Sequence, residues 1–315
     1  MTGVAPRAAG VRIGYADVPP RVRAWVDGVL GSPVREWAEQ VGGMSPGCAT
    51  RVVTADGTRA FVKAVGPELN PATPDMFRTE VAALRHLGSG SLWADLHAAL
   101  DEPGGWVALV LEDVPGRHAD LGSRPEADRV LAATDELSVT LAGRGTDAAL
   151  GRCADTVRRW SEVWQHVPPA GDGVLPSWVS AHAGRFARDH TRLVEAATAE
   201  QLVHGDLRND NLLVLDDGAV VFVDWGGCRL GPAWFDPLLL RLEWVEHPEF
   251  DEMVRESPAL AALGEDLVTA FLVGVGAWLG WRSTVAVDVN LPTLNEFRVR
   301  ESARLLEGAR RRLGL

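Results

Sequence analysis

Between residues 34 and 65 the chain alternates hydrophobic and polar positions and turns twice, a pattern that predicts an antiparallel β-sheet. The first turn is a glycine-rich loop at residues 42–47. The second is the pair Asp56-Gly57, a strong hairpin signal between two apolar runs. The predicted order is strand, glycine loop, strand, tight turn, strand, and a short helix is expected before them at residues 20–30.

The hydrophobic pattern changes after this sheet. Phe77, Val81 and Leu84 recur at helical spacing and predict a helix over residues 74–87. Residues 106–111 form an uninterrupted apolar run, which is typical of a buried strand. The helix is therefore expected to lie between two strands of the chain.

A polar connector follows this strand, and we expect it to divide the chain into two lobes, residues 1–112 and residues 113–315. The pattern beyond it is mostly helical. Helices are expected at residues 125–141, 154–165, 178–197 and 296–313, and a compact β segment at residues 201–223. The expected fold class is therefore α+β, with an antiparallel sheet in the first lobe and mainly helices in the second.

Composition places the 315-residue chain among ordinary globular proteins, with 46% hydrophobic and 23% charged residues. The longest uncharged stretch, residues 267–281, is too short to span a membrane and is expected to be a buried core helix. No export signal is visible, and the three cysteines, Cys48, Cys153 and Cys228, form neither a disulfide framework nor a zinc-binding pair. These features favour a cytoplasmic protein without a membrane partner.

The net charge of −12 argues against a nucleic-acid partner, because phosphates would be repelled over most of the surface. The charge is uneven: 12 acidic and 10 basic residues lie in residues 1–112, and 31 acidic and 21 basic residues follow. A cationic substrate would be drawn to a cleft that opens on the second lobe, although acidity also serves solubility. Acidic candidates for recognising an amine are Glu243, Glu246, Asp251 and Glu252.

Lys63 is the only lysine in the chain, beside 30 arginines. A general preference for arginine explains most of this bias. However, a position that needs a compact ammonium group would also resist replacement by a planar guanidinium. Lys63, on the third predicted strand, is therefore a candidate for a specific function.

Three polar residues in and after the predicted β segment can support phosphoryl transfer. A hydroxyl that attacks a γ-phosphate needs a carboxylate to orient it and accept its proton, and we assign this role to Asp206. Asn211 can offer an amide oxygen, and Asp224 offers a carboxylate at the end of an apolar strand. Both are hard ligands suited to Mg²⁺.

These residues carry a family resemblance. His204-Gly205-Asp206 with Asn211 resembles the H-G-D-x-x-x-x-N motif of the aminoglycoside phosphotransferases, a family related to the protein kinases. Asp224 matches the metal-binding Asp of the kinase D-F-G triplet, although the triplet here reads Asp-Trp-Gly. The resemblance implies a two-lobed, protein-kinase-like fold.

The resemblance also implies nucleotide-binding roles in the first lobe. Lys63 would contact the α- and β-phosphates and be held by Glu80 on the neighbouring helix. The glycine loop lacks the full G-x-G-x-x-G pattern of protein kinases, but its exposed N–H groups could still cover phosphates. The candidates in this loop are Gly43, Gly47 and Ser45, whose hydroxyl could donate to the β- or γ-phosphate.

Further residues match the family pattern near the connector and the catalytic motif. The backbone atoms of Glu112 and Val114 would pair with the purine, as the family's hinge does. Arg208 lies where protein kinases place a lysine that steadies the transferring phosphate, so it is a catalytic candidate; the alternative is an ordinary surface arginine. Asp236 would brace the catalytic loop, and His204 is expected to pack beneath it.

The family resemblance implies an O-phosphotransferase that uses ATP or GTP with Mg²⁺ and acts as a monomer or homodimer. The expected acceptor is a small-molecule hydroxyl, either on an aminoglycoside-type or other cationic antibiotic or on a choline-, homoserine-, sugar- or nucleoside-like metabolite. Protein kinase activity is disfavoured because about twelve residues from Asp224 to Asp236 leave no room for an activation loop. A nucleotide-binding pseudokinase would be expected to lack Lys63, Asp206, Asn211 or Asp224, and all four are present.

Overall fold

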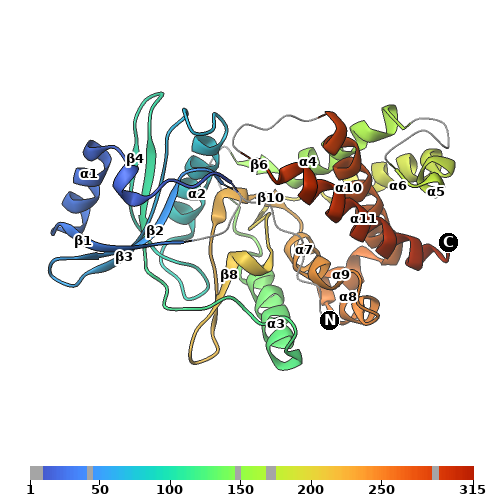
Figure 1. Cartoon of the computed structure of the whole chain (residues 1–315). Coiled ribbons are helices and arrows are strands. Elements are labelled where there is room, and N and C mark those ends of the chain that lie inside the picture. The colour runs from blue at the N-terminus through green and yellow to red at the C-terminus, as the bar shows by residue number, and fades with distance from the viewer. Residues whose placement is uncertain (1–9, 41–44, 146–149, 168–174, 286–290) are drawn as a thin grey trace.

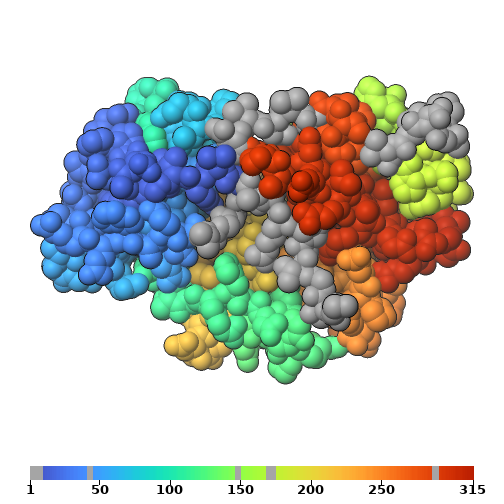
Figure 2. All heavy atoms as spheres, in the orientation of Figure 1, coloured from blue at the N-terminus to red at the C-terminus, as the bar shows by residue number. Residues whose placement is uncertain are grey.

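The computed structural model describes residues 10–40, 45–145, 150–167, 175–285 and 291–315. An antiparallel sheet with helices on both faces forms one lobe, and a mainly helical region forms the other (Figure 1). In the space-filling view, residues early in the chain gather at one end of the molecule and the C-terminal residues at the other (Figure 2). The expected α+β fold with two lobes is therefore confirmed.

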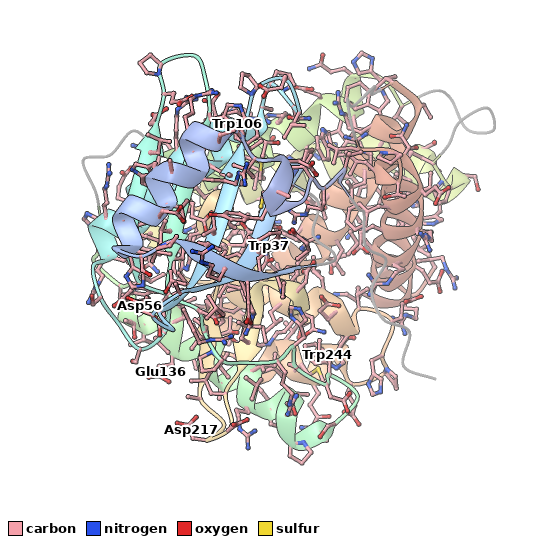
Figure 3. The ribbon with its side chains drawn as sticks, turned by 60° about the vertical axis from the view of Figure 1, so that its left-hand side comes forward. Trp37, Asp56, Trp106, Glu136, Asp217 and Trp244 are labelled. Atoms are coloured by element: carbon pink, nitrogen blue, oxygen red, sulfur yellow. The ribbon has the colours of Figure 1, made fainter. Side chains whose placement is uncertain are left out.

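The sheet of the first lobe has the strand order β1-β2-β3-β5-β4, and every neighbouring pair is antiparallel. Strands β1 to β5 are Val34–Glu39, Cys48–Thr54, Arg59–Val65, Leu96–Asp101 and Val107–Leu111. The Asp56-Gly57 turn is present, but it is part of a longer connection at residues 55–58, with Gly57 at φ 90°. Asp56 marks the tip of this hairpin in Figure 3.

Strand β4 was not predicted from the sequence. Its residues, Leu96–Asp101, include no β-branched or aromatic side chain, and it lies at the edge of the sheet with no fully buried residue. The sequence of this segment therefore has neither high β propensity nor a regular alternation of apolar and polar residues, the two signals that identify a strand. Pairing with β5 decides its conformation.

Alternation along β3 places the two faces of the sheet against different cores. Ala60, Val62 and Ala64 pack with helix α1 (Pro20–Leu30) in one hydrophobic cluster. Val65 packs in another cluster, with helix α2 (Thr73–Leu87) and the second lobe. Lys63 has the same parity as Val65, so its side chain points to the α2 face, where the two lobes meet.

We propose the boundary between the lobes after Glu112, directly past the end of β5. The α-helices beyond it are α3 (Arg124–Thr140), α4 (Cys153–Trp160), α5 (Ser177–Ala181), α6 (Ala183–Ala196), α7 (Phe235–Arg241), α8 (Phe250–Glu256), α9 (Pro258–Leu263), α10 (Glu265–Val285) and α11 (Leu294–Leu313). Single 3₁₀ turns are η1 (Tyr15–Asp17), η2 (Ser161–Gln165), η3 (Asn209–Asn211), η4 (Trp225–Gly227) and η5 (Leu242–Trp244).

Three short strands lie within the predicted β segment, residues 201–223: β7 (Gln201–Val203), β8 (Leu212–Val214) and β9 (Val220–Phe222). Two more, β6 (Gly151–Arg152) and β10 (Arg229–Gly231), lie outside the predicted bounds. Strands β8 and β9 form a hairpin, and β10 lies between β6 and β7. The motif from His204 to Asn211 lies between β7 and β8, and Asp224 follows β9.

The helix predicted over residues 178–197 is divided into α5 and α6 at His182. The His182 ring Nδ1 lies 2.8 Å from the Trp178 carbonyl oxygen. That carbonyl would accept the His182 backbone N–H in a continuous helix, but this N–H donates to Val179 instead, at 3.2 Å. A side chain that takes the place of a backbone donor thus ends α5.

Helices α10 and α11 pack closely in the second lobe, and glycines make this close approach possible (Figure 1). The stretch expected to be a buried core helix, residues 267–281, lies within α10. Within the described ranges, no helix has both the length and the apolar character needed to cross a bilayer. A Cβ added at Gly276 on α10 would lie 3.0 Å from Leu306 Cγ on α11. Gly308 on α11 faces Val245, which follows η5 and whose Cγ2 would lie 2.6 Å from an added Cβ.

We expect Gly308→Ala to lower the free energy of unfolding by about 1–3 kcal/mol, because the new methyl group overlaps a branched side chain and the Val245 carbonyl oxygen, 3.2 Å away. The matched control is Gly28→Ala on α1, where an added Cβ meets nothing within 4 Å. It should stabilise by about 0.5–1 kcal/mol through helix propensity. Urea denaturation measures the free energy of unfolding of both variants. Equal changes in Gly308→Ala and Gly28→Ala would contradict the packing role of Gly308.

Candidate active site

A cleft with a cavity volume of about 180 Å³ lies where the two lobes meet. Its apolar walls come from the sheet of the first lobe on one side and from the β8–β9 region on the other. They include Ala49, Phe61, Leu111, Leu213 and Val223, and charged side chains of Lys63, Glu80 and Asp224 line it as well. Apolar walls beside charged groups can hold a flat ring and a phosphate chain together.

Lys63 joins the two lobes through two carboxylates. Its Nζ donates to Glu80 Oε1 and Oε2 at 2.9 and 2.7 Å and to Asp224 Oδ1 at 2.8 Å. Glu80 is 1% exposed and Lys63 8% exposed, so both charges are almost fully removed from water. Burial alone would lower the pKa of Lys63, but the charges of Asp224 and Glu80 outweigh it and raise the pKa. The amine therefore stays an ammonium ion.

Asp224 has an unusual backbone. With φ 64° and ψ 61° it is the only non-glycine residue in the described ranges with positive φ, a conformation that costs roughly 1–2 kcal/mol for a side chain with a Cβ. Burial opposes ionisation of its carboxyl, but the adjacent ammonium of Lys63 wins and lowers the pKa of Asp224. The side chain is 37% exposed, so the carboxylate is open to the cleft.

Asp236, at the start of α7, fixes the beginning of the loop that carries the motif from His204 to Asn211. Its two carboxylate oxygens accept the backbone N–H groups of His204 and Gly205 at 2.7 and 2.8 Å. Gly205 has φ 77°, and a Cβ at this position would collide with the Gly227 carbonyl oxygen. Only glycine fits here, because the loop is both left-handed and pressed against another backbone.

His204 packs beneath the loop as expected. It is fully buried, and its Nε2 lies 2.9 Å from the Val223 carbonyl oxygen. Trp225, the middle residue of the Asp-Trp-Gly triplet, lies against His204 with ring centroids 4.8 Å apart and is itself buried. Both rings therefore pack in the core under the loop, and Trp225 is also among the residues that line the cleft.

Asp206 and Asn211 are connected across the catalytic loop. The Asn211 amide donates to the Asp206 carbonyl oxygen at 2.7 Å and to Asp206 Oδ2 at 3.3 Å. Arg208 Nε lies 3.5 Å from Asp206 Oδ1, and its Nη2 lies 3.4 Å from Asp210 Oδ2. Burial raises the pKa of the Asp206 carboxyl, and the Arg208 charge partly offsets this. A raised pKa makes a carboxylate a better proton acceptor near neutral pH.

The donor set around Asn211 and Asp224 fits a hard divalent cation. The Val223 N–H donates to the Asn211 carbonyl at 2.9 Å, which sets residues 211 and 224 close together. The Asn211 side-chain oxygen makes no hydrogen bond with any residue that the structure describes. An amide oxygen and a carboxylate leave most coordination positions to water and phosphate oxygens, as Mg²⁺ prefers. No group of three or more His, Cys, Asp or Glu side chains in the described ranges forms a separate metal site.

The remaining predicted residues lie on the rim or on the connector. Glu112 and Val114 line the cleft. Gly47 has φ 124°, lies against the β3 backbone and donates its N–H to the Val11 carbonyl at 3.3 Å. Ser45 is half-buried, and neither Ser45 nor Gly47 is among the residues that line the cleft. Gly43 lies outside the described residues.

Sequence reasoning missed several cleft residues on the sheet, among them Ala49, Arg51, Phe61 and Leu111. Phe61 lies two positions before Lys63 on β3 and therefore on the same face, and Arg51 is its cross-strand partner on β2. The period of two along β3 would have identified Phe61 once Lys63 had been singled out. Arg51 needs the strand register, which the sequence does not give.

The acidic residues suggested for amine recognition lie in different surroundings. Glu243 is next to the catalytic loop, where its Oε1 accepts the Asn209 backbone N–H at 3.0 Å. Glu246 is paired with Arg304 and Asp251 with Arg312. Glu252 is exposed on α8. Of the four, Glu243 contacts the catalytic loop directly.

The sequence model of the phosphotransferase enzyme family matches residues 49–268 of the chain. No curated protein matches the chain at a significant level. Among solved structures, aminoglycoside phosphotransferase APH(4)-Ia is 15% identical over 92% of this chain and 97% of its own, with a TM-score of 0.63. Choline kinase LicA from Streptococcus pneumoniae is 15% identical over 92% and 97%, with a TM-score of 0.56. The expected protein-kinase-like fold is thereby confirmed.

The bracing role of Asp236 can be measured. In Asp236→Ala two buried N–H groups lose their acceptor, so we expect the free energy of unfolding to fall by about 2–4 kcal/mol. Asp217→Ala is the matched control: Asp217 also accepts one backbone N–H, that of Ala219, but lies exposed at the tip of the β8–β9 hairpin (Figure 3). This control should cost about 0.5 kcal/mol or less in urea denaturation. A similar cost for both variants would argue against the brace.

Proposed function

The chain belongs to the phosphotransferase enzyme family and is a small-molecule kinase, and we propose that it moves the γ-phosphoryl group of ATP or GTP to a hydroxyl of a cationic natural-product antibiotic. The observation that carries this proposal is the ion cluster of Lys63, Glu80 and Asp224 at a cleft that Asp206 and Asn211 adjoin. Lys63 and Asp224 line the cleft and could contact a phosphate chain and its metal ion. Asp206, the proposed proton acceptor, does not line the cleft itself but accepts a hydrogen bond from Asn211, which does.

The proposed nucleotide position follows from the chemistry of the cleft walls. The apolar surfaces of Phe61, Leu213 and Val223 would enclose the purine, and the Lys63 ammonium would contact the α- and β-phosphates. Lys63 already carries two carboxylate partners, which hold it in a fixed position before the nucleotide arrives. Such preorganisation avoids the cost of arranging charges during the reaction.

Asn211 and Asp224 would hold Mg²⁺, which supplies charge neutralisation for the phosphate oxygens. The acceptor hydroxyl would lie against Asp206, whose side chain is 38% exposed and therefore reachable from solvent. As the hydroxyl oxygen bonds to the γ-phosphorus, the bond to the β-phosphate oxygen breaks and the nucleoside diphosphate leaves. Asp206 accepts the hydroxyl proton, and Arg208 beside it stabilises the charge of the transferring group.

Acidic groups near the catalytic loop support a cationic acceptor. Glu243 accepts the Asn209 N–H, and Glu301 on α11 is buried beside Arg304, at 2.6 Å. Burial raises the pKa of Glu301, opposed by Arg304. The net charge of −12 would also attract a cation to the surface.

The antibiotic class is further supported by two structural neighbours. One is again APH(4)-Ia, as a thermostable mutant in a ternary complex with ADP and hygromycin B, 15% identical over 92% of this chain and 98% of its own, with a TM-score of 0.62. The other is an amicoumacin kinase crystallised with AMP-PNP and Ca²⁺, 13% identical over 85% and 88%, with a TM-score of 0.51. The similarity to a choline kinase makes small amino-alcohols the alternative acceptors to test. We place the enzyme in the cytoplasm as a monomer or homodimer, without nucleic-acid or membrane partners.

A nucleotide-consumption screen tests this function. Purified protein with Mg²⁺ and ATP or GTP is offered cationic antibiotics, nucleoside antibiotics and small amino-alcohols, and release of the nucleoside diphosphate is followed. We expect a cationic antibiotic to stimulate release, and Asp206→Ala to reduce it by about 10²–10⁴-fold because the proton acceptor is lost. Stimulation by amino-alcohols alone would assign the chain to metabolite phosphorylation. Nucleotide binding without any transfer would favour the pseudokinase alternative.

The compact charge of Lys63 gives a second test. In Lys63→Arg a planar guanidinium cannot take the place of one nitrogen that lies within 2.9 Å of both Glu80 and Asp224, so transfer should fall by at least about tenfold. Arg59→Lys is the reverse exchange on the same strand, where the exposed Arg59 side chain pairs with the buried carboxylate of Asp113. It should leave the rate within about twofold of the wild type. Near-normal turnover of Lys63→Arg would refute the proposed role.

A further inference from the structure

Arg51 reaches from strand β2 to the connector between the lobes. Its Nη2 donates to the Val114 carbonyl oxygen at 3.1 Å, and its Nη1 lies 3.2 Å from Asp113 Oδ1. Arg51 also lines the cleft, as do Glu112 and Val114. The guanidinium is therefore part of the edge that a purine in this cleft would face.

Asp113 holds this arginine in place. Its side chain is 3% exposed and pairs with two arginines, Arg51 and Arg59, the second through Oδ2 at 2.9 Å. A buried carboxylate needs such partners, because its desolvation is otherwise uncompensated. Arg51 is thus fixed by a charge behind the connector and by a carbonyl on the connector itself.

The Val114 carbonyl has no acceptor capacity left. A carbonyl oxygen has two lone pairs, and here one accepts Arg51 Nη2 and the other accepts the Gly116 N–H at 2.9 Å. The Val114 N–H and the Glu112 carbonyl oxygen, by contrast, make no hydrogen bond within the part of the chain that the structure describes. The connector therefore offers one free donor and one free acceptor, in the order Glu112 carbonyl, Val114 amide.

Adenine and guanine place different demands on this edge. Adenine carries the N6 amino donor next to the N1 acceptor, which matches the Glu112 carbonyl followed by the Val114 N–H. Guanine carries the O6 acceptor next to the N1–H donor. With O6 on the Val114 N–H, the guanine N1–H needs the next carbonyl, that of Val114, which Arg51 and Gly116 already occupy.

On the premise that the cleft binds a nucleotide as proposed above, we infer that Arg51 makes the site select adenine over guanine by occupying the Val114 carbonyl. A bound guanine would either leave its N1–H unpaired in a buried cleft or displace a guanidinium held by Asp113. An unpaired buried donor weakens binding by roughly ten- to a hundredfold. Arg51 is on this view a specificity-determining residue.

Isothermal titration calorimetry with AMP-PNP and GMP-PNP in the presence of Mg²⁺ tests the inference without any acceptor. The wild-type chain should bind AMP-PNP at least about tenfold more tightly than GMP-PNP. In Arg51→Met, which keeps the aliphatic stem and frees the carbonyl, the ratio should fall to within about threefold, mainly through tighter binding of GMP-PNP. Arg59→Met is the matched control, since it also removes an arginine from Asp113 but none from Val114, and it should keep the wild-type ratio.

Equal affinity of the wild type for both analogues would overturn the inference, and this comparison needs no variant to fold. An unchanged ratio in Arg51→Met, with thermal unfolding showing a folded protein, would also overturn it. So would an equal loss of discrimination in Arg59→Met, because the Asp113 ion pairs would then be responsible. If neither analogue binds the wild type, the proposed function itself is wrong, which is a different result from binding without discrimination.

Discussion

The ammonium group of Lys63 and its two carboxylates are the interaction on which the rest of the site depends. The three groups come from strand β3, helix α2 and the segment after β9, and two of them are almost fully buried. A buried ion is tolerable only when it is paired, so α2 must pack on the sheet and Asp224 must approach from the second lobe. The charge requirement of one side chain thus fixes where the lobes meet and gives the cleft its polar groups.

A second constraint fixes the catalytic loop relative to this cluster. Asp236 gathers two backbone N–H groups at the start of the loop, and Gly205 accepts a conformation and a close contact that no other residue fits. Asp224, which follows β9, takes a left-handed backbone conformation. The proposed proton acceptor and metal ligands are therefore held by backbone geometry and buried hydrogen bonds, and their positions do not depend on flexible surface side chains.

Polarity changes from one part of the cleft to another. The sheet side presents Phe61 and Arg51, the catalytic side presents carboxylates partly balanced by Arg208, and Glu243 and Glu301 lie beyond the catalytic loop. This distribution supports a nucleotide between the lobes and a positively charged acceptor on the second lobe. The short interval between Asp224 and α7 is filled by η4 and β10. No segment remains there for a peptide platform, which agrees with a small acceptor.

The sequence by itself determined the motif residues and, apart from β4, the order of strands and helix α2 in the first lobe. Both depend on neighbours in the chain: alternation places Lys63 on a strand face, and the spacing of Asp206, Asn211 and Asp224 identifies their chemistry. Only the tertiary structure decided the edge strand β4, the break at His182 and the bond from Arg51 to the Val114 carbonyl. Sheet pairing, a side chain that replaces a backbone donor, and strand register decided these features. The interacting groups lie far apart in sequence or are selected by packing, so these features cannot be predicted from local sequence patterns. Burial likewise decided the surroundings of Lys63: the sequence singles it out as the only lysine, and the fold makes it a buried ion paired with two carboxylates.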